Sequence, residues 1–288
     1  MARPDKLKTR IFLDSGDPAE THEAIRLLGF LDGQTTNPTL ITKNPKTQGR
    51  KFTQKEIYNF YRDTVIEISE LIPKGSVSIE TYADESTASA AMLEQGTEMF
   101  SWITNAHIKF PITQAGLEAA NKAVKKGLRI NMTLCFNQEQ AGAVYMATQG
   151  ASRGSVFVSP FVGRLDDRGI NGMDLIADII RVFEFSDHHV EVLTASVRNK
   201  DHLLYALKLG SDIVTAPLNV LKEWVENGLA IPGRDYQYRR DDLKRLSCDY
   251  TNFARNWYDF NITHELTEAG IKKFSDDWNT LILNDGSN

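Results

Sequence analysis

The chain has 288 residues, of which 41% are hydrophobic and 25% charged, a composition typical of a protein that buries a large core. Its 33 basic and 38 acidic residues give a net charge of −5. This charge disfavours nucleic acid as a partner, but a few arginines can still form a local phosphate site. Two cysteines, Cys135 and Cys248, are too few for a disulfide framework. The amino terminus lacks an apolar signal-peptide core and no stretch is apolar enough to span a membrane, so the expected location is the cytoplasm.

Short β-type runs alternate with helix-type segments along most of the chain. The first helix has clear start signals, with Asp17 as N-cap and Pro18 at the first helical position. Gly127 and Gly210 follow two later helices, where a C-terminal glycine is favoured. In chain order, the predicted elements are strand 10–14, helix 18–28, strand 30–36, helix 54–71, strand 77–80, helix 85–95, strand 106–110, helix 113–126, strand 129–133, a helix opened by a capping-box-like sequence at 137–140, strand 155–159, helix 174–185, strand 190–194, helix 200–209, strand 212–215 and a terminal helix 267–278.

Eight predicted strands favour an α/β fold with a single (β/α)8 TIM barrel over residues 1–288. From Asp14 to Thr215 the strand ends are about 29 residues apart on average, which suits βα units. An open, doubly wound sheet is the competitor, but no Gly-x-Gly-x-x-Gly turn follows any strand. The segment from about 231 to 261 is rich in Arg, Asp, Tyr and Asn and interrupts the pattern. We interpret it as an insertion before the terminal helix that covers the barrel mouth, shapes the choice of a substrate there or contacts another subunit.

Lys109 lies in a short apolar run that ends at Pro111. Lysine is rarely buried unless its charge is paired or used, and loss of hydration favours the neutral amine, which is a nucleophile. The alternative is a strand-end lysine whose ammonium reaches water. Polar residues also end nearly every other predicted strand. Because the carboxyl ends of all strands in a (β/α)8 barrel meet at one mouth, these residues are expected to gather around Lys109.

The chain resembles the transaldolases, which are class I Schiff-base aldolases of the transaldolase and fructose-6-phosphate aldolase superfamily. The matching segments occur in family order over roughly residues 10–224 and in the terminal helix, and together they are highly specific. The resemblance rests on Leu13-Asp14-Ser15-Gly16-Asp17, Gly33-Gln34-Thr35-Thr36-Asn37-Pro38-Thr39-Leu40, Val77-Ser78-Ile79-Glu80, Ile108-Lys109-Phe110-Pro111-Ile112-Thr113, Asn131-Met132-Thr133-Leu134, Ser159-Pro160-Phe161-Val162-Gly163-Arg164-Leu165-Asp166-Asp167 and Ala195-Ser196-Val197-Arg198-Asn199.

The resemblance implies a catalytic role for four residues. Lys109 is expected to form a Schiff base with a ketose phosphate, such as sedoheptulose 7-phosphate or fructose 6-phosphate. Asp14 is expected to take the C4 hydroxyl proton, so that an aldose phosphate leaves and a dihydroxyacetone unit stays on the lysine. Glu80 is expected to act as acid and base through a water held with Thr133. Taken alone, Glu80 is also compatible with a solvated strand-end acid and Thr133 with an ordinary strand residue.

The resemblance also implies the residues that bind the substrate. Asn37 and Asn131 are expected to hold the dihydroxyacetone hydroxyls, although Asn37 also fits a turn former before Pro38. Arg164 and Arg198 are expected to bind the phosphate, because a guanidinium matches phosphate with two parallel hydrogen bonds. An ion pair of Arg164 with Asp166 or Asp167 is the structural alternative. The remaining contacts expected at the mouth are Ser159, Phe161 and Ser196.

Transfer of the dihydroxyacetone unit to glyceraldehyde 3-phosphate or erythrose 4-phosphate, in the non-oxidative pentose phosphate pathway, is the predicted function. The alternative is a fructose-6-phosphate aldolase, which releases free dihydroxyacetone; those relatives typically carry Gln and Tyr where Glu80 and Phe161 stand. A non-catalytic barrel used for binding is disfavoured because the catalytic set is complete. No metal is expected, since the histidines lack ligand spacing, and no cofactor is expected. A homo-oligomer is left open.

Overall fold

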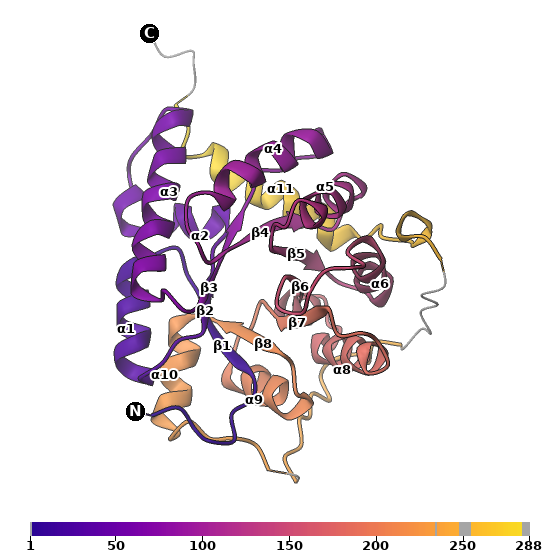
Figure 1. Ribbon diagram of the computed structural model, residues 1–288. Coiled ribbons are helices and arrows are strands. Elements are labelled where there is room, and N and C mark those ends of the chain that lie inside the picture. The colour runs from indigo at the N-terminus through magenta and orange to yellow at the C-terminus, as the bar shows by residue number, and fades with distance from the viewer. Residues whose placement is uncertain (1, 234, 248–254, 284–288) are drawn as a thin grey trace.

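A closed barrel of parallel strands forms the centre of the computed structural model, which describes residues 2–233, 235–247 and 255–283 (Figure 1). Each strand pairs with the next along the chain, and β8 closes the barrel on β1. The predicted (β/α)8 TIM barrel is therefore confirmed. The strands are β1 (Arg10–Asp14), β2 (Gly33–Thr35), β3 (Ser76–Glu80), β4 (Ala106–Pro111), β5 (Ile130–Cys135), β6 (Val156–Pro160), β7 (Val190–Thr194) and β8 (Ile213–Ala216).

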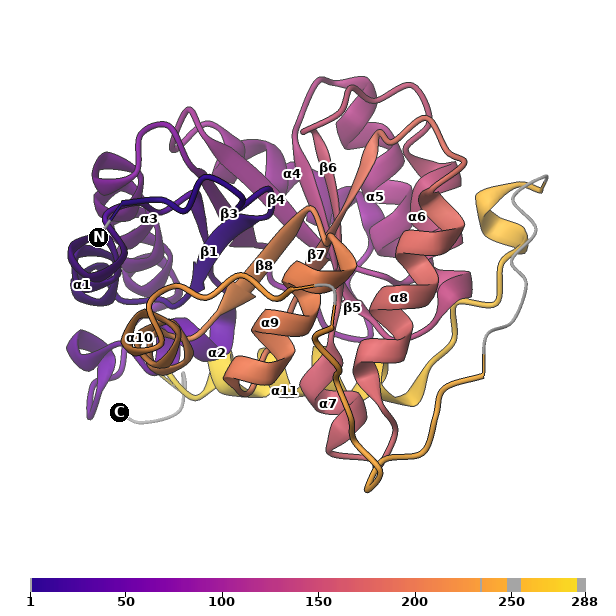
Figure 2. The same cartoon turned by 90° about the horizontal axis from the view of Figure 1, so that it is seen from below.

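Helices that follow the strands surround the barrel, and shorter segments lie at its ends. In Figure 2, α2, α7 and α11 lie along the same edge of the molecule, which is the carboxyl-terminal end of the strands. We call this end of the barrel the mouth. The helices are α1 (Pro18–Leu28), α2 (Pro38–Thr42), α3 (Gln54–Leu71), α4 (Ser89–Phe100), α5 (Gln114–Lys125), α6 (Gln138–Ala147), α7 (Val162–Asp166), α8 (Gly172–Phe183), α9 (Lys200–Leu209), α10 (Leu218–Glu226) and α11 (Glu265–Asn279), with 3-10 turns η1 (Pro45–Thr47) and η2 (Trp257–Asp259).

Local capping signals act where the sequence predicted them. The Asp17 side chain accepts from the Ala19 backbone N–H at 3.0 Å, and Pro18 begins α1. Asn137 caps α6 by accepting from the Gln140 N–H at 2.8 Å. The Gln140 side chain, however, accepts from the Phe136 N–H at 2.7 Å instead of completing a reciprocal box. Both caps satisfy backbone donors that have no partner within their own helices.

The helix predicted over residues 85–95 is wrong at both ends, because α4 spans Ser89–Phe100. Asp84 holds the preceding residues in a turn. Its carboxylate accepts from the backbone N–H and hydroxyl of Ser86, each at 2.9 Å, and from the Thr87 hydroxyl at 2.7 Å. Such local side-chain bonds offer the backbone an alternative to a helix. The short second strand expected within residues 30–36 is β2, which contains residues 33–35.

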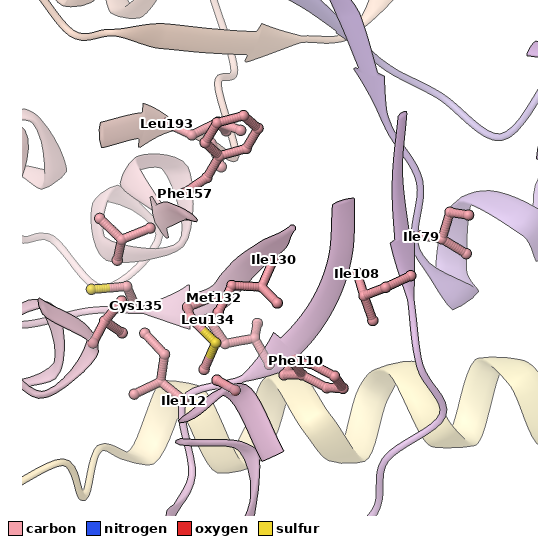
Figure 3. Packing of buried hydrophobic residues seen from close by; sticks show 14 of the residues in the cluster. Ile79, Ile108, Phe110, Ile112, Ile130, Met132, Leu134, Cys135, Phe157 and Leu193 are labelled. Atoms are coloured by element: carbon pink, nitrogen blue, oxygen red, sulfur yellow. The ribbon is translucent and has the colours of Figure 1, made fainter. Parts of the chain in front are cut away.

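In β4 and β5, apolar residues that pack toward the helices alternate with polar residues that face the barrel interior. In β4, Ile108 and Phe110 flank Lys109, and in β5 Ile130 and Met132 belong to the same buried cluster (Figure 3). These four apolar side chains are fully buried. Because successive side chains of a strand point to opposite faces, the packing that fixes Ile108 and Phe110 also directs Lys109 inward.

The insertion runs over the outside of α9 and α8 before the chain returns to the mouth as α11 (Figure 2). We call residues 235–247 the strap. Tyr238 of the strap stacks on Tyr205 of α9, with ring centroids 4.6 Å apart. Lys244 pairs with Ile170 in an isolated parallel bridge. None of the described insertion residues lines the mouth cavity, so the described part of the insertion does not form its wall, and the predicted roles in substrate choice or a subunit contact stay predictions. Cys248 lies outside the described residues.

Terminal helix α11 covers part of the mouth instead. Its Asp277 accepts a hydrogen bond from Thr39 of α2, and Thr267 donates to the Leu134 carbonyl at 2.9 Å. These bonds tie both ends of α11 to elements at the carboxyl ends of β2 and β5. No helix within the described residues is long and apolar enough to cross a membrane.

Candidate active site

Lys109 is buried at the end of β4, with 3% of its surface exposed. The parallel register of β3 and β4 sets Glu80 opposite Lys109, and the ammonium forms an ion pair with Glu80 Oε2 at 2.7 Å. Lys109 Nζ also donates to the Thr36 carbonyl at 3.0 Å. Burial raises the pKa of Glu80 from its ordinary value, and the charge of Lys109 opposes part of that rise. The pair thus joins a lysine to a carboxylate that accepts protons more readily than usual.

Tyr61 of α3 holds both groups that contact the lysine, and the sequence analysis did not identify it as a site residue. Its phenol accepts from the Glu80 backbone N–H at 2.9 Å and lies 2.6 Å from the Thr36 hydroxyl. Thr36 donates its own proton to the Ser78 carbonyl at 2.7 Å, so Tyr61 donates to Thr36. Tyr61 is 1% exposed. It therefore fixes the ends of β2 and β3 from behind the barrel wall.

Asp14 stands across the mouth at the end of β1, partly exposed to the cavity. Thr35 donates to Asp14 Oδ1 at 2.6 Å, and the Thr35 hydroxyl lies 2.7 Å from that of Thr215. Burial raises the pKa of Asp14, while the Thr35 hydrogen bond and the charge of Lys109 offset part of the rise. A carboxylate with a raised pKa is suited to take and return a proton near neutral pH.

Thr133 and Asn131 lie at successive inward positions of β5. The Thr133 hydroxyl is buried and has no hydrogen-bond partner among the described residues, so it is available to a water or substrate in the cavity that it lines. Asn131 lies deeper, and both its amide oxygen and its amide nitrogen are hydrogen-bonded. It accepts from Ser159 Oγ at 2.6 Å and donates to Ser78 Oγ at 3.1 Å. In this geometry Asn131 orients Ser159 instead of lining the cavity.

A cavity of about 660 Å³ opens at the mouth. Its size suits a small-molecule substrate. Of the predicted site residues, Glu80 and Asn131 lie behind its wall. The others line it: Asp14, Asn37, Lys109, Thr133, Ser159, Phe161, Arg164, Ser196 and Arg198. The mouth thereby brings together residues from β1, β4, β5 and β6 and the segments after β2, β6 and β7, as the convergence of strand ends in a barrel requires.

Asn37 has a structural role in addition to its place at the mouth. Its Oδ1 accepts from the Leu40 N–H at 2.9 Å and caps α2, which begins at Pro38. This structural role is a helix N-cap and not the turn predicted before Pro38. The same cap fixes where the side chain stands on the cavity wall.

Arg164 lies between two aromatic rings at one side of the cavity. Its guanidinium carbon is 5.3 Å from the Phe161 ring centroid and 5.1 Å from that of Phe274 in α11. Gly270 permits this packing, because a Cβ there would fall 2.6 Å from Arg164 Nη1. The predicted alternative, an ion pair of Arg164 with Asp166 or Asp167, is not what forms: Asp167 pairs with Arg198 at 2.9 Å. Arg164 is thus held by packing and presents its charge to the cavity.

The segment carrying Ser196 and Arg198 approaches α7 closely. Ser196 has a φ of 58°, in the left-handed region, which is costly for a residue with a side chain and is typical of functional sites. Its carbonyl accepts from the Gly163 N–H at 3.0 Å. A Cβ at position 163 would lie 2.4 Å from that carbonyl and 2.3 Å from Arg198 Nε. Gly163 therefore lets the loop after β7 lie directly against the start of α7, which sets Arg198 beside Arg164.

Three further cations line the cavity that the sequence analysis did not identify: Lys43, Arg168 and Lys273. Lys43 and Arg168 follow α2 and α7, and Lys273 lies within α11, so no strand end indicated them. The lining residues carry six basic side chains and two acidic ones, Asp14 and Asp167, although the whole chain has a net charge of −5. A concave surface lined by one sign of charge concentrates ligands of the opposite sign. The mouth is accordingly suited to an anionic ligand.

Residues 11–284 match the sequence family described as Transaldolase/Fructose-6-phosphate aldolase. This chain belongs to that family. A probable transaldolase of Dehalococcoides mccartyi is 39% identical over 224 residues, covering 78% of this chain and 94% of the relative. A probable transaldolase of a Thermoanaerobacter species is 34% identical over 269 residues, covering 93% of this chain and 96% of the relative. A solved 3-hexulose-6-phosphate synthase from Salmonella typhimurium, at 13% identity over 77% of this chain and 98% of that chain, has a TM-score of 0.46, too low to carry an argument.

The family match includes every predicted site residue as well as the insertion and α11. The recognition made from the sequence segments is therefore confirmed. Within the described residues, no group of three His, Cys, Asp or Glu side chains is placed to hold a metal ion.

Proposed function

We propose that this protein is a transaldolase that moves a dihydroxyacetone unit from a ketose phosphate to an aldose phosphate through a Schiff base on Lys109. The observation that carries the proposal is the buried Lys109 ammonium, which opens on a cationic cavity and lies 2.7 Å from Glu80. Donors such as fructose 6-phosphate and sedoheptulose 7-phosphate, and acceptors such as glyceraldehyde 3-phosphate and erythrose 4-phosphate, fit this chemistry. The reaction belongs to the non-oxidative pentose phosphate pathway.

Formation of the Schiff base begins with a proton transfer from Lys109 to Glu80. The free amine then attacks the C2 carbonyl of the ketose, and the resulting carbinolamine loses its hydroxyl as water when Glu80 returns the proton. The raised pKa of Glu80 suits both directions of this transfer. The buried Thr133 hydroxyl, which has no partner among the described residues, is available to hold the water that leaves and later re-enters.

Cleavage uses the second carboxylate of the site, that of Asp14, which lines the cavity at the end of β1. Asp14 removes the proton of the C4 hydroxyl, the C3–C4 bond breaks, and its electron pair moves into the iminium to form an enamine on Lys109. The aldose phosphate leaves with its new aldehyde. A second aldose phosphate then enters, the enamine adds to its aldehyde, and Asp14 returns the proton. The Thr35 hydroxyl, 2.6 Å from Asp14 Oδ1, keeps the carboxylate aimed during both steps.

The phosphate end of the substrate is assigned to Arg164, Ser196 and Arg198. Two arginines side by side offer paired hydrogen bonds and permanent charge to a phosphate dianion. Arg164 is the better preorganised of the two, because Phe161 and Phe274 flank it. Arg198 is more exposed and exchanges its contact with Asp167 for the ligand.

An aldolase that releases free dihydroxyacetone is the second candidate, because the family contains both activities by its description. Glu80 and Phe161 favour transfer. The Phe161 ring lines the cavity beside Arg164 and offers no hydroxyl that could activate water against the enamine. Exclusion of such a donor favours capture of the adduct by a second sugar over its loss to water.

The test of the Schiff base is borohydride reduction in the presence of fructose 6-phosphate, followed by peptide mass spectrometry. Wild-type protein should gain a dihydroxyacetone-derived mass on Lys109, Lys109→Ala should gain none, and the exposed Lys125→Ala on α5 should behave as wild type. An adduct of equal yield in Lys109→Ala, or no adduct in the wild type, contradicts the proposal.

Transfer is distinguished from release by assaying free dihydroxyacetone with and without erythrose 4-phosphate. A transaldolase forms product with the acceptor and little free dihydroxyacetone without it. Equal rates of dihydroxyacetone release in both assays identify the aldolase instead.

A further inference from the structure

The strap contacts the elements that carry both phosphate-site arginines. Arg240 of the strap donates through Nη1 to Asp166 Oδ2 at 3.1 Å, at the end of α7, the helix that contains Arg164. Its Nη2 and Nε bind Asp242 of the strap itself, at 2.7 and 2.8 Å. The guanidinium is therefore held in place within the strap before it reaches Asp166. The Asp166 side chain is only 10% exposed, so this contact is more protected than an ordinary surface pair.

A buried histidine connects Asp166 to Arg198 by hydrogen bonds. His202 is fully buried and donates from Nε2 to Asp166 Oδ2 at 2.9 Å. The Arg198 backbone N–H, which can only donate, bonds to His202 Nδ1 at 3.3 Å. That bond assigns the His202 proton to Nε2. A chain of contacts thus runs from Arg240 through Asp166 and His202 to the backbone of Arg198.

The same carboxylate also fixes the turn after α7. Asp166 Oδ1 accepts from the Gly172 N–H at 2.9 Å, at the start of α8. Lys244 of the strap accepts from the Asn171 N–H and donates to the Gly169 carbonyl, both at 2.8 Å. The strap therefore holds the turn between α7 and α8 at Gly169, Asn171 and Asp166. Burial alone would raise the pKa of Asp166, but the hydrogen bonds from His202 and Gly172 and the charge of Arg240 hold it below its ordinary value. Asp166 at the centre of this arrangement is therefore charged at neutral pH.

We propose that the strap, through Arg240, is a positioning device for phosphate recognition, and that it sets the preference of the enzyme for phosphorylated over unphosphorylated substrates. Arg240 acts on Arg198 through Asp166 and His202, and on Arg164 through α7; it does not itself line the cavity. The inference rests on the proposed function, which assigns the phosphate to Arg164 and Arg198. Lys109, Glu80 and Asp14 form no hydrogen bond or ion pair with Arg240, Asp166 or His202 among the described residues, so the loss of Arg240 leaves the direct bonds at the lysine in place.

The test compares Arg240→Ala with wild type on fructose 6-phosphate and on unphosphorylated fructose. Loss of one net hydrogen bond to a positioning carboxylate should raise KM for fructose 6-phosphate about two- to tenfold and weaken competitive inhibition by inorganic phosphate by the same factor. The value of kcat, turnover of fructose and borohydride trapping of dihydroxyacetone on Lys109 should stay unchanged. Arg239→Ala is the matched control, because the exposed Arg239 bonds to Gln237 within the strap and to no other residue that the structure describes. Arg240→Lys should recover part of the loss.

A role limited to fold stability predicts a different result: Arg240→Ala would lower activity on both sugars equally, together with the melting temperature, and that outcome overturns the inference. So does an unchanged KM for fructose 6-phosphate with unchanged phosphate inhibition. If Arg240→Ala does not fold, Asp166→Asn serves as the second variant, with the same expected split. Failure of the proposed function is recognised separately, because wild type then forms no borohydride adduct, whereas calorimetric binding of inorganic phosphate to wild type and Arg240→Ala still tests the strap.

Discussion

Charged side chains lie at both ends of the barrel, but the two ends partner them differently. At the amino end, which we call the floor, Arg10 and Arg153 both reach the buried Glu191, at 2.7 and 3.3 Å, and Arg153 also reaches Asp212 at 2.9 Å. At the mouth, six cations face two acids along the cavity. The charges at the floor are paired with one another and close that end of the barrel. The mouth has an excess of positive charge that can bind an anionic ligand.

Titratable groups follow the same division. His107 at the floor lies 2.8 Å from Ser76 Oγ and 2.9 Å from the Gly154 carbonyl, and stacks on Phe157. Burial lowers its pKa to about 3, so it stays neutral and structural. At the mouth, burial instead raises the pKa of Asp14 and Glu80 toward the pH at which proton transfer is useful. Burial of a titratable group therefore indicates a reactive site only where a ligand or another titratable group can exchange a proton with it.

The largest effect that tests this comparison is expected for Asp14→Asn. Loss of the proposed general base should lower kcat about 10²- to 10⁴-fold. The fold should become more stable at neutral pH. Because the native-state pKa lies above the ordinary value of 3.8, ionised Asp14 costs stability, and this cost appears as the pH rises through the interval between the two values. The gain in melting temperature should therefore vanish in acid, below 3.8.

Asp17→Asn is the control for Asp14→Asn, because Asp17 is a partly exposed N-cap and asparagine caps equally well. It should change neither activity nor the pH dependence of stability. A melting temperature for Asp14→Asn that falls at neutral pH would show that the mouth carboxylate stabilises the fold, as floor charges do, and would break the comparison.

The next effect concerns the support of the mouth by Tyr61. Tyr61→Phe removes the hydroxyl that bonds to Glu80 N–H and to Thr36. We expect kcat and the rate of borohydride trapping to fall about tenfold, the equivalent of one well-placed hydrogen bond, with KM nearly unchanged. Tyr58→Phe is the matched control, since Tyr58 lies on the same helix and also packs on Trp102, with centroids 4.9 Å apart. Equal losses in both variants would identify a general packing effect of α3.

The smallest effect is expected at the floor. Glu191→Gln leaves Arg10 and Arg153 without their shared carboxylate. Because both arginines are partly exposed, we expect a loss of about 1–2 kcal/mol in the free energy of unfolding and no change in kcat beyond about twofold. Chemical denaturation and a standard assay measure the two quantities. The corresponding mouth variant, Glu80→Gln, should lose most of its activity; a large loss of kcat in Glu191→Gln would contradict the proposed division.

Much of the barrel and of the reactive centre could be predicted from the sequence, because both depend on local signals. Strand spacing and the polar residue at each strand end indicated the closed barrel and the gathering around Lys109. The choice between a turn and a helix was harder to predict at Asp84. There the sequence allows either structure, and hydrogen bonds from Ser86 and Thr87 to the Asp84 carboxylate stabilise the turn.

Residues that reach the site by tertiary packing could not be predicted. Tyr61 acts from behind the barrel wall, and Lys273 enters from a helix far along the chain. No spacing in the sequence relates either residue to Lys109. The same holds for Arg240, whose contact with Asp166 depends on the path of the strap across α9 and α7. The placement of Asn131 one layer below the cavity reflects bonds to Ser78 and Ser159 that its position in β5 alone does not reveal.

The packing of α11 on Arg164 has a consequence for the order in which the protein matures. Phe274 and Gly270 contact a guanidinium that was added to the chain more than a hundred residues earlier. During synthesis, amino-terminal parts emerge from the ribosome first, so the barrel strands can assemble while the phosphate side of the cavity still lacks one wall. Full affinity for substrate therefore requires α11 to pack on Arg164 after the strands have formed.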